Sequence, residues 1–236
     1  MRFEPPLRPA RLIRRYKRFL ADVELPDGRR TTVHCPNTGA MLGCAEPGMA
    51  VYLSRAANPD RKYPLTWELV EALPRVWVGI HTGRTNALVR EALLDGALQE
   101  LAGYRAIQAE AKLHKGFRVD FMLRGHGNRP DCCLEVKNVT AAVTDGVALF
   151  PDAVSERASR HLRELMEQAA AGERAVLCFC VQRDDVNEVR PADEIDPVYG
   201  ATLREALAAG VEVLAYAARV SPEEVRIHRR VPVVAP

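Results

Sequence analysis

The residue pattern changes near residue 80, and this change limits the folds open to the chain more than any other feature. Before it, short apolar runs alternate with turn signals such as Pro-Asp-Gly-Arg at 26–29. The runs on either side of that turn, 19–25 and 30–35, predict a hairpin. Further runs at 49–54 and 67–70 are candidates for strands or a short helix. Many short strands at this spacing are typical of a small barrel.

After residue 80, helical and strand patterns alternate. The predicted helices cover 86–101, about 152–170 and 199–209, and the predicted strands cover 104–112, 117–123, 132–139, 176–182 and 211–219. This order, α-β-β-β-α-β-α-β, is typical of an α/β sandwich with a mixed sheet. We therefore predict two domains, 1–80 and 81–236, and a chain of 236 residues is long enough for both.

The composition is that of an ordinary globular protein, with 47% hydrophobic and 27% charged residues, which excludes disordered and collagen-like chains. No apolar run approaches the roughly 18 residues of a membrane-spanning helix. The first residues also lack the apolar stretch of a secretory leader, so we expect a cytoplasmic protein with no membrane partner. The six cysteines form no C-x-x-C pair, and we expect reduced, structural thiols.

Positive charge is concentrated at the start of the chain, although the net charge is only +2. Between residues 2 and 18, seven basic residues accompany a single glutamate. Such a block is either a solvated face or a patch that contacts phosphates and releases counterions. The candidate DNA contacts are Arg11, Arg14, Arg15, Lys17 and Arg18.

The segment 118–137 carries the main candidate site. Glu135 and Lys137 are two apart on a predicted strand, so they project from one face. If the preceding strand pairs with it as a hairpin, Leu123 lies opposite Cys132, and Asp120 lies opposite Glu135. Two adjacent carboxylates can hold one divalent cation, and a lysine beside them can position a water or offset phosphorane charge. Alternatively, the Glu-x-Lys pair is a surface pair.

Asp131 is a less suitable partner for Glu135, although it follows a proline. The two residues are four apart on one strand, about 13 Å, which is too far to share a metal ion. We therefore assign the metal ligands as Asp120 and Glu135.

Three more residues are candidates for the same site. On a helical wheel Glu91 lies between Leu88 and Leu98, the side expected to face the sheet, which suggests a third acid unless it reaches solvent at the helix end. Arg157 and His161 border the apolar stripe of the second helix and are candidate DNA contacts. For His161, an ordinary position on the flank of a helix is the alternative.

Five motifs resemble the sugar fermentation stimulation protein A family over essentially the whole chain. They are His34-Cys-Pro-Asn-Thr-Gly-Ala-Met, Arg118-Val-Asp-Phe, Glu135-Val-Lys-Asn-Val-Thr, Leu149-Phe-Pro-Asp-Ala-Val-Ser-Glu-Arg and His161-Leu-Arg-Glu-Leu. The resemblance implies an N-terminal OB-fold-like barrel and a C-terminal α/β domain of the PD-(D/E)xK nuclease type. Asp120, Glu135 and Lys137 match the nuclease motif, Glu91 matches more loosely, and Val119 stands where the motif has proline.

The resemblance implies a DNA-binding protein with little sequence specificity and a regulatory link to sugar, especially maltose, metabolism. The alternative is an active nuclease that uses Mg²⁺ or Mn²⁺. A sequence-specific regulator is a third class, but the sequence has no helix-turn-helix pattern. The partner is then single- or double-stranded DNA, and whether the chain forms a homodimer stays open.

Overall fold

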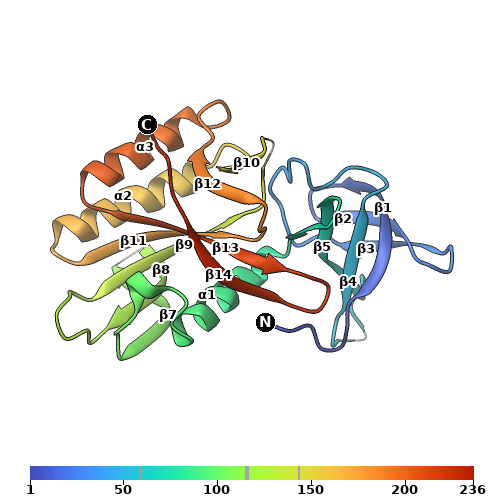
Figure 1. The fold of residues 1–236 in the computed structure, drawn as a ribbon, viewed down its shortest axis with the longest axis horizontal. Helices are drawn as coiled ribbons and strands as arrows, with labels where there is room; N and C mark the ends of the chain where they lie inside the picture. Colours follow the sequence, from blue (N-terminus) through green and yellow to red (C-terminus); the bar gives the residue numbers. More distant parts are fainter. Residues whose placement is uncertain (59, 115–116, 143) are drawn as a thin grey trace.

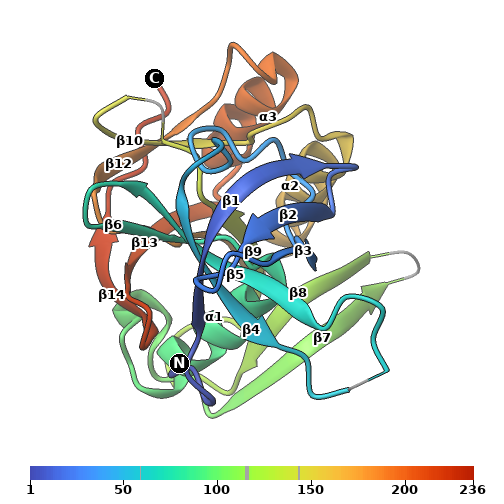
Figure 2. The ribbon, with the colours of Figure 1, turned by 90° about the vertical axis from the view of Figure 1, so that its right-hand side faces the viewer.

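The computed structural model describes residues 1–58, 60–114, 117–142 and 144–236, and within these ranges the first domain is a barrel of short strands (Figure 1). Its strands are β1 (Arg8–Tyr16), β2 (Leu20–Glu24), β3 (Arg30–His34), β4 (Ala50–Arg55), β5 (Leu65–Leu73) and β6 (Val76–Gly79). They follow the order β3-β2-β1-β4-β5-β6, and β3 also pairs with β5 at His34 and Thr66. This pairing closes the barrel, which is seen from its outer side in Figure 2, and the predicted OB-fold-like domain is confirmed.

The basic block of residues 2–18 contains a strand that the sequence did not predict. β1 pairs with both β2 and β4, and Leu12 points from it into the barrel core. Lys17 and Arg18 have positive φ values of 50° and 64° and form the turn into β2. The candidate DNA contacts between Arg11 and Arg18 therefore lie along the hairpin of β1 and β2.

Trp67 fills the centre of the barrel and is fully buried. Its indole Nε1 donates to the carbonyl of Leu69 at 2.9 Å, so the polar atom is satisfied within the core. Trp67 is therefore a core residue whose ring does not reach the surface of the barrel.

The second domain is built on a mixed sheet. Its helices are α1 (Thr85–Leu94), α2 (Glu156–Ala170) and α3 (Pro197–Ala208), with 3-10 turns at Thr82–Arg84 and Gln99–Leu101. Its strands are β7 (Ala106–His114), β8 (Phe117–Arg124), β9 (Cys132–Val139), β10 (Gly146–Phe150), β11 (Arg174–Val181), β12 (Val186–Pro191), β13 (Glu212–Val220) and β14 (Val225–Val231). The main sheet has the order β14-β13-β11-β9-β8-β7, in which β9, β11 and β13 are parallel, while β10 and β12 form a small separate sheet. The predicted mixed sheet is confirmed.

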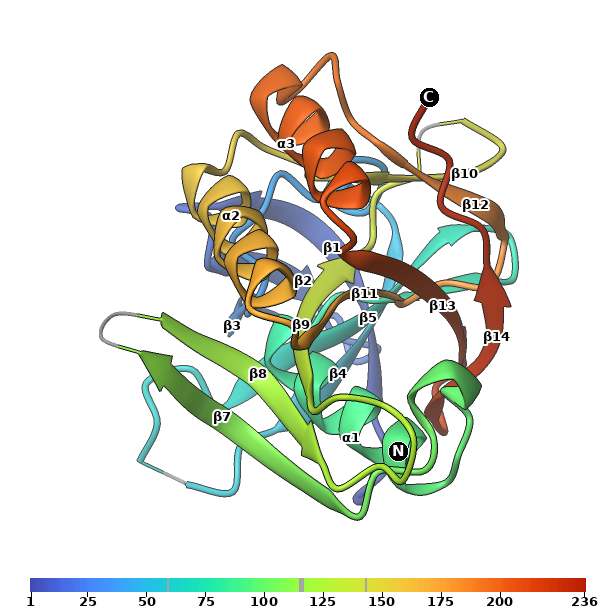
Figure 3. The ribbon, with the colours of Figure 1, turned by 90° about the vertical axis from the view of Figure 1, so that its left-hand side faces the viewer.

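The helices cover both faces of the main sheet. α2 and α3 pack together on one face, and α1 lies on the other, near the N-terminus (Figures 1 and 3). Each face has its own apolar core. Leu162, Leu177 and Phe179 belong to the first, and Leu88 and Leu134 belong to the second.

Two helix boundaries differ from the sequence prediction by more than two residues. α1 ends at Leu94 because Gly96 adopts a positive φ of 76°, so residues 99–101 form a separate turn. α2 begins at Glu156, where the Ser155 hydroxyl caps the helix by accepting from the amide of Ala158 at 3.2 Å. The strands β6, β10, β12 and β14 were also not predicted.

All six cysteines are free and buried, as expected. Within the part of the chain that the structure describes, no helix is both long enough and apolar enough to span a membrane.

Candidate functional site

The candidate site lies where β8 separates from β9. Leu123 pairs with Cys132, Met122 with Cys133 and Phe121 with Leu134, so the predicted register is confirmed. The pairing ends there, and Asp120 is the next residue on β8. Its position opposite Glu135 therefore follows from this register.

The Asp120 carboxylate fills the gap between the diverging strands. Its Oδ2 accepts from the amide of Val136 at 2.7 Å, in place of a main-chain hydrogen bond. Its Oδ1 accepts from Nδ2 of Asn86 in the first turn of α1 at 2.7 Å. The carboxylate is thus held by one main-chain donor and one side chain from the helix below the sheet.

Glu135 is at the centre of the cluster and is only 3% exposed. Its Oε1 accepts from Nζ of Lys137, two residues along β9, at 2.6 Å. The same oxygen is bonded to Nδ1 of His161 on α2. His161 in turn accepts from Nε of Arg157 at 3.3 Å. The structure therefore joins β9 and α2 through an unbroken chain of polar contacts.

The pKa values of the two carboxylates are shifted in opposite directions from their usual values. Burial and the nearby charge of Glu135 raise the pKa of Asp120, and its two hydrogen bonds offset this only in part. Burial alone would raise the pKa of Glu135, but the hydrogen bond to His161 and the charge of Lys137 lower it below its usual range. A cation near Asp120 would relieve the repulsion that raises its pKa.

A second polar cluster, which the sequence pattern did not predict, lies beside Lys137. Oδ1 of Asn138 accepts from Nε2 of Gln182 at 2.5 Å and from the hydroxyl of Thr85 at 3.1 Å. Gln182 follows β11 and is only 2% exposed. The signal available in the sequence was a polar residue at the end of a fully apolar strand.

The structure places Glu91 away from this site. Its Oε1 accepts from the ammonium group of Met1 at 2.8 Å, and its side chain is 43% exposed. Asn86 is the residue of α1 that contacts Asp120, and five helical positions separate it from Glu91, about 140° around the helix. The prediction relied on Leu98 to mark the side facing the sheet, but the helix ends before Leu98.

The basic side chains of the barrel that were predicted to contact DNA fall into two groups. Some of them hold loops of the barrel, and the others are exposed. Arg15 and Arg18 donate to carbonyls of the loop 37–40, and Arg11 donates to the carbonyl of Gly48 at 2.6 Å. Arg14 is exposed and pairs with Asp22 at 2.8 Å. Lys17 is exposed and makes no hydrogen bond or ion pair within the described ranges. Only some of the predicted patch is therefore free to meet a phosphate.

The carboxylate oxygens of Asp120 and Glu135 are the kind of ligand that Mg²⁺ and Mn²⁺ prefer. They do not form a complete set of protein ligands around an ion. The described residues contain no group of three or more His, Cys, Asp or Glu side chains that could hold a metal ion. Mg²⁺ needs no such group, because it keeps several waters and binds through one or two carboxylates. Glu135 Oε2 makes no hydrogen bond within the described part of the chain, so one oxygen is available as a ligand.

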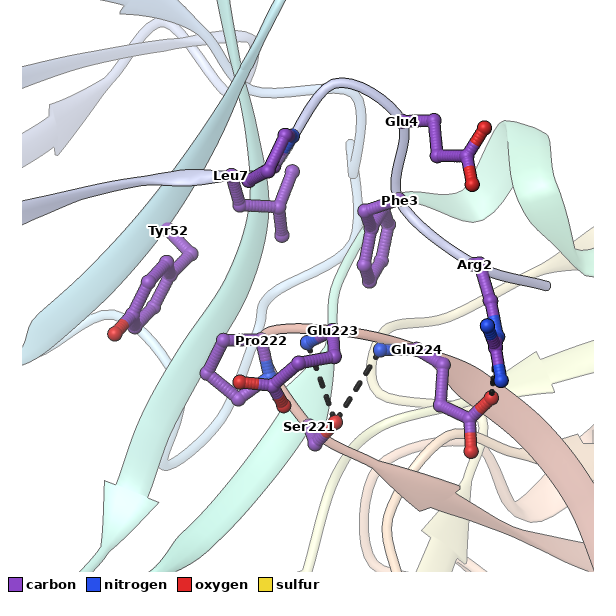
Figure 4. Close-up of a pocket in the computed structure, with 10 residues that line it drawn as sticks. Arg2, Phe3, Glu4, Leu7, Tyr52, Ser221, Pro222, Glu223 and Glu224 are labelled. Atoms are coloured by element: carbon purple, nitrogen blue, oxygen red, sulfur yellow. Dashed lines mark hydrogen bonds and ion pairs between the residues drawn. The ribbon is translucent and has the colours of Figure 1, made fainter.

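Two cavities flank the domain boundary. One, of about 380 Å³, is lined by the barrel loop 37–39 and by Lys137, Arg157 and Phe150 of the second domain. The other, of about 650 Å³, lies between the N-terminal segment and the turn from β13 to β14, where Phe3, Leu7 and Tyr52 surround it (Figure 4). None of the predicted site residues lines the cavity of Figure 4.

The comparisons with known proteins agree with this architecture. Residues 13–80 match the SfsA N-terminal OB domain, and residues 83–224 match the sugar fermentation stimulation protein RE domain. A sugar fermentation stimulation protein homolog of Alkalilimnicola ehrlichii is 58% identical over 238 residues and covers 100% of both chains. A homolog of Thioalkalivibrio sulfidiphilus is 56% identical, covering 97% of this chain and 96% of its own.

A solved structure shares the whole fold. It is described as Pyrococcus furiosus SfsA in complex with Ca²⁺, is 26% identical, and matches with a TM-score of 0.88 over 99% of this chain and 98% of that chain. Both domains, their order and their sequences thus match one family. The chain belongs to the sugar fermentation stimulation protein family, SfsA.

Proposed function

We propose that this protein binds DNA with little sequence specificity and hydrolyses a phosphodiester bond with Mg²⁺ or Mn²⁺ held by Asp120 and Glu135. The observation that carries the proposal is the register of β8 and β9, which brings Asp120, Glu135 and Lys137 together at one point of the sheet. Two neighbouring carboxylates and a lysine are the groups that metal-assisted phosphodiester hydrolysis requires.

A related protein supports the metal assignment. The Pyrococcus furiosus relative was solved with Ca²⁺, a cation that prefers oxygen ligands as Mg²⁺ does. In this chain the carboxylates of Asp120 and Glu135 would hold the ion. When bound, such an ion lowers the pKa of a coordinated water and neutralises charge on the phosphoryl oxygens.

The side chains around the carboxylates have distinct tasks. Lys137 stands at 2.6 Å from Glu135 Oε1, from where its ammonium group can orient a water or meet the charge that develops on the phosphate. His161 holds Glu135 from the side of α2, and Arg157 donates to His161. Asn86 and the amide of Val136 fix Asp120.

The contact to DNA would be mainly electrostatic. The exposed side chains of Arg14, Lys17 and Arg157 carry positive charge on the two domains. Contacts of this kind are made to the phosphate backbone and carry no base code. We therefore expect strong dependence on salt and little dependence on sequence.

The test uses labelled single- and double-stranded DNA with Mg²⁺, with Mn²⁺ or with EDTA, and measures cleavage and mobility shift in the same samples. The Glu135→Gln variant should lose metal-dependent cleavage and still bind DNA. The control Glu167→Gln changes an exposed acid on α2 and should cleave like the wild type. Cleavage that survives Glu135→Gln would contradict the assignment of the site.

A second candidate is DNA binding without cleavage, and one observation favours it. Both oxygens of Asp120 and one oxygen of Glu135 already accept hydrogen bonds from protein groups. Binding by the wild type without cutting under every metal condition would select this candidate.

We propose that any role in sugar metabolism acts through the same nonspecific binding. Within the described ranges the three α-helices are separated by strands, so they form no helix-turn-helix pair. Equal affinity for a scrambled sequence and for promoter DNA of sugar genes would support this route, and a clear preference for the promoter would contradict it.

A further inference from the structure

The cavity of about 380 Å³ between the domains is built from both of them. The barrel contributes Asn37, Thr38 and Gly39, which belong to the Pro-Asn-Thr-Gly motif for which the sequence suggested no chemistry. The second domain contributes Lys137 from β9 and Arg157 from α2. The cavity thus opens directly beside the candidate site and depends on the loop of the other domain.

The loop that forms one wall of the cavity is held by two arginine side chains of the barrel. Arg15 Nη2 donates to the carbonyls of Asn37 and Gly39 at 2.9 and 2.8 Å, and Arg18 Nε donates to the carbonyl of Thr38 at 2.8 Å. With its carbonyls engaged on that side, the loop is fixed before any ligand arrives.

The same loop also packs closely against the second domain. Asp152 accepts from the amide of Met41 at 3.0 Å, and a Cβ built on Gly39 would collide with the same carboxylate. Thr82 donates to the carbonyl of Pro36 at 2.8 Å, which ties the loop to the start of the second domain. The wall is therefore a rigid part of the junction between the domains.

The lining combines charged and apolar side chains. Lys137 and Arg157 both line the cavity, together with Asp152, whose carboxylate accepts from the amide of Met41. The terminal guanidinium nitrogens of Arg157 make no hydrogen bond within the described residues. Asn37 Nδ2 and the Thr38 hydroxyl also have no partner there. Leu149 and Phe150 provide apolar surface. Free donors, two cations and an apolar wall together match a phosphate joined to a flat, partly apolar group.

We propose that this cavity binds one unpaired nucleotide of a DNA strand, with its phosphate beside the cationic groups of Lys137 and Arg157. The inference rests on the proposed function and names its substrate class as strand ends or single strands. A cavity of about 380 Å³ holds a ligand of nucleotide size, and a stacked base pair of an intact duplex does not fit into it. A base must therefore leave its stack before its nucleotide enters.

The experiment measures binding in EDTA, so that it is independent of cleavage. Fluorescence anisotropy compares a fully paired duplex with the same duplex carrying a short unpaired thymidine extension. The wild type should prefer the extension by roughly tenfold or more, because a paired nucleotide must first be unstacked and unpaired. Equal affinity of the wild type for the two DNAs would overturn the proposal.

Thr38→Phe tests the cavity itself. Thr38 is exposed and its carbonyl is held by Arg18, so the larger side chain can occupy the cavity while the loop keeps its hydrogen bonds. This variant should lose the preference for the extension, and the control Thr38→Ser should keep it. A preference that survives in a folded Thr38→Phe protein would overturn the proposal.

A second pair of variants covers the case in which Thr38→Phe does not fold. Arg157→Met should weaken binding to the extended duplex more than to the paired one, whereas Arg163→Met, on an exposed position of the same helix, should not. Equal effects of the two would overturn the proposal. Cleavage of paired and unpaired DNA at equal rates would support the proposed function and contradict this inference. The predicted binding preference without any cleavage would support this inference and contradict the proposed hydrolysis.

Discussion

Replacement of Arg15 by methionine separates a structural role from a role in DNA binding. Arg15 was predicted to contact phosphate, but its Nη2 lies within 2.9 Å of the carbonyls of Arg18, Asn37 and Gly39. We therefore expect that Arg15→Met destabilises the barrel. Lys17→Met is the matched control, because Lys17 is exposed and has no polar partner in the described residues.

The size of the effect follows from the number of hydrogen bonds that the nitrogen can make. Nη2 carries two hydrogens, so the three carbonyls share two full bonds. Because Arg15 is only half-buried, each bond is worth about 1–1.5 kcal/mol, or about 2–3 kcal/mol in all. The Arg15 Nε is buried without a partner, and its removal recovers part of this. The net loss should be about 1–2 kcal/mol of unfolding free energy, while Lys17→Met should change it by less than about 0.5 kcal/mol.

Urea unfolding followed by tryptophan fluorescence is the appropriate assay, because Trp67 and Trp77 both lie in the barrel. The midpoint should fall in Arg15→Met with an unchanged slope. In DNA binding, Lys17→Met should reduce the slope of log affinity against log salt by about 0.9 if it meets one phosphate of duplex DNA. The reasoning is refuted if Arg15→Met is as stable as Lys17→Met and lowers the salt slope equally.

Three further predictions concern the metal, the thiols and acid stability. Mg²⁺ or Mn²⁺ at ten times its dissociation constant should stabilise the wild type by about 1.4 kcal/mol, roughly 3–6 °C in a thermal shift assay, and Glu135→Gln should abolish this gain. All six cysteines should resist a thiol reagent at pH 8 until urea unfolds the chain, because they are buried and burial raises the pKa of Cys44 and Cys133 to about 11; rapid labelling of the native protein would contradict this. The hydrogen bond from Arg174 lowers the pKa of Glu212 below its usual 4.5. The stability that Glu212→Gln loses, measured by urea titration, should therefore be constant above about pH 4.5 and shrink as the pH falls through the lowered pKa. A stability difference that grows in acid would contradict this.

The features that could be predicted from the sequence are those that a local rule decides. The turn at 26–29 joins β2 and β3, and the predicted strand 132–139 coincides with β9. Counting residues back from the loop between β8 and β9 predicts the correct register, because antiparallel neighbours joined by a short loop have few alternative pairings. The position of Asp120 next to Glu135 is therefore a consequence of loop length and strand alternation alone.

The hydrophobic pattern of the sequence fails to predict the structure where charged residues or tertiary contacts obscure it. β1 and β14 carry basic residues at many of their outward positions, and each contains or faces a bulge, so the two-residue alternation is broken. Glu91 was placed on the wrong side because the wheel extended a helix that Gly96 ends. Asn86 was missed because an amide has no marked pattern of its own, and its role depends on which strand lies above it.

The Pro-Asn-Thr-Gly motif shows why the two domains have to be considered together. Within the barrel the motif is only a turn, but Asp152 and Thr82 of the second domain bond to this loop, and Arg157 lines the same cavity. Gly79 makes a similar contact, since its amide donates to the carbonyl of Gln182 at 2.9 Å and a Cβ there would collide with the Gln182 side chain. Because Gln182 also donates to Asn138, the residue next to Lys137 on β9, hydrogen bonds connect the junction to the strand that carries the candidate site. A barrel that shifted against the second domain would therefore alter the surroundings of Lys137. In the proposed complex, DNA held by the barrel loop would be presented to the carboxylates at a fixed distance and orientation.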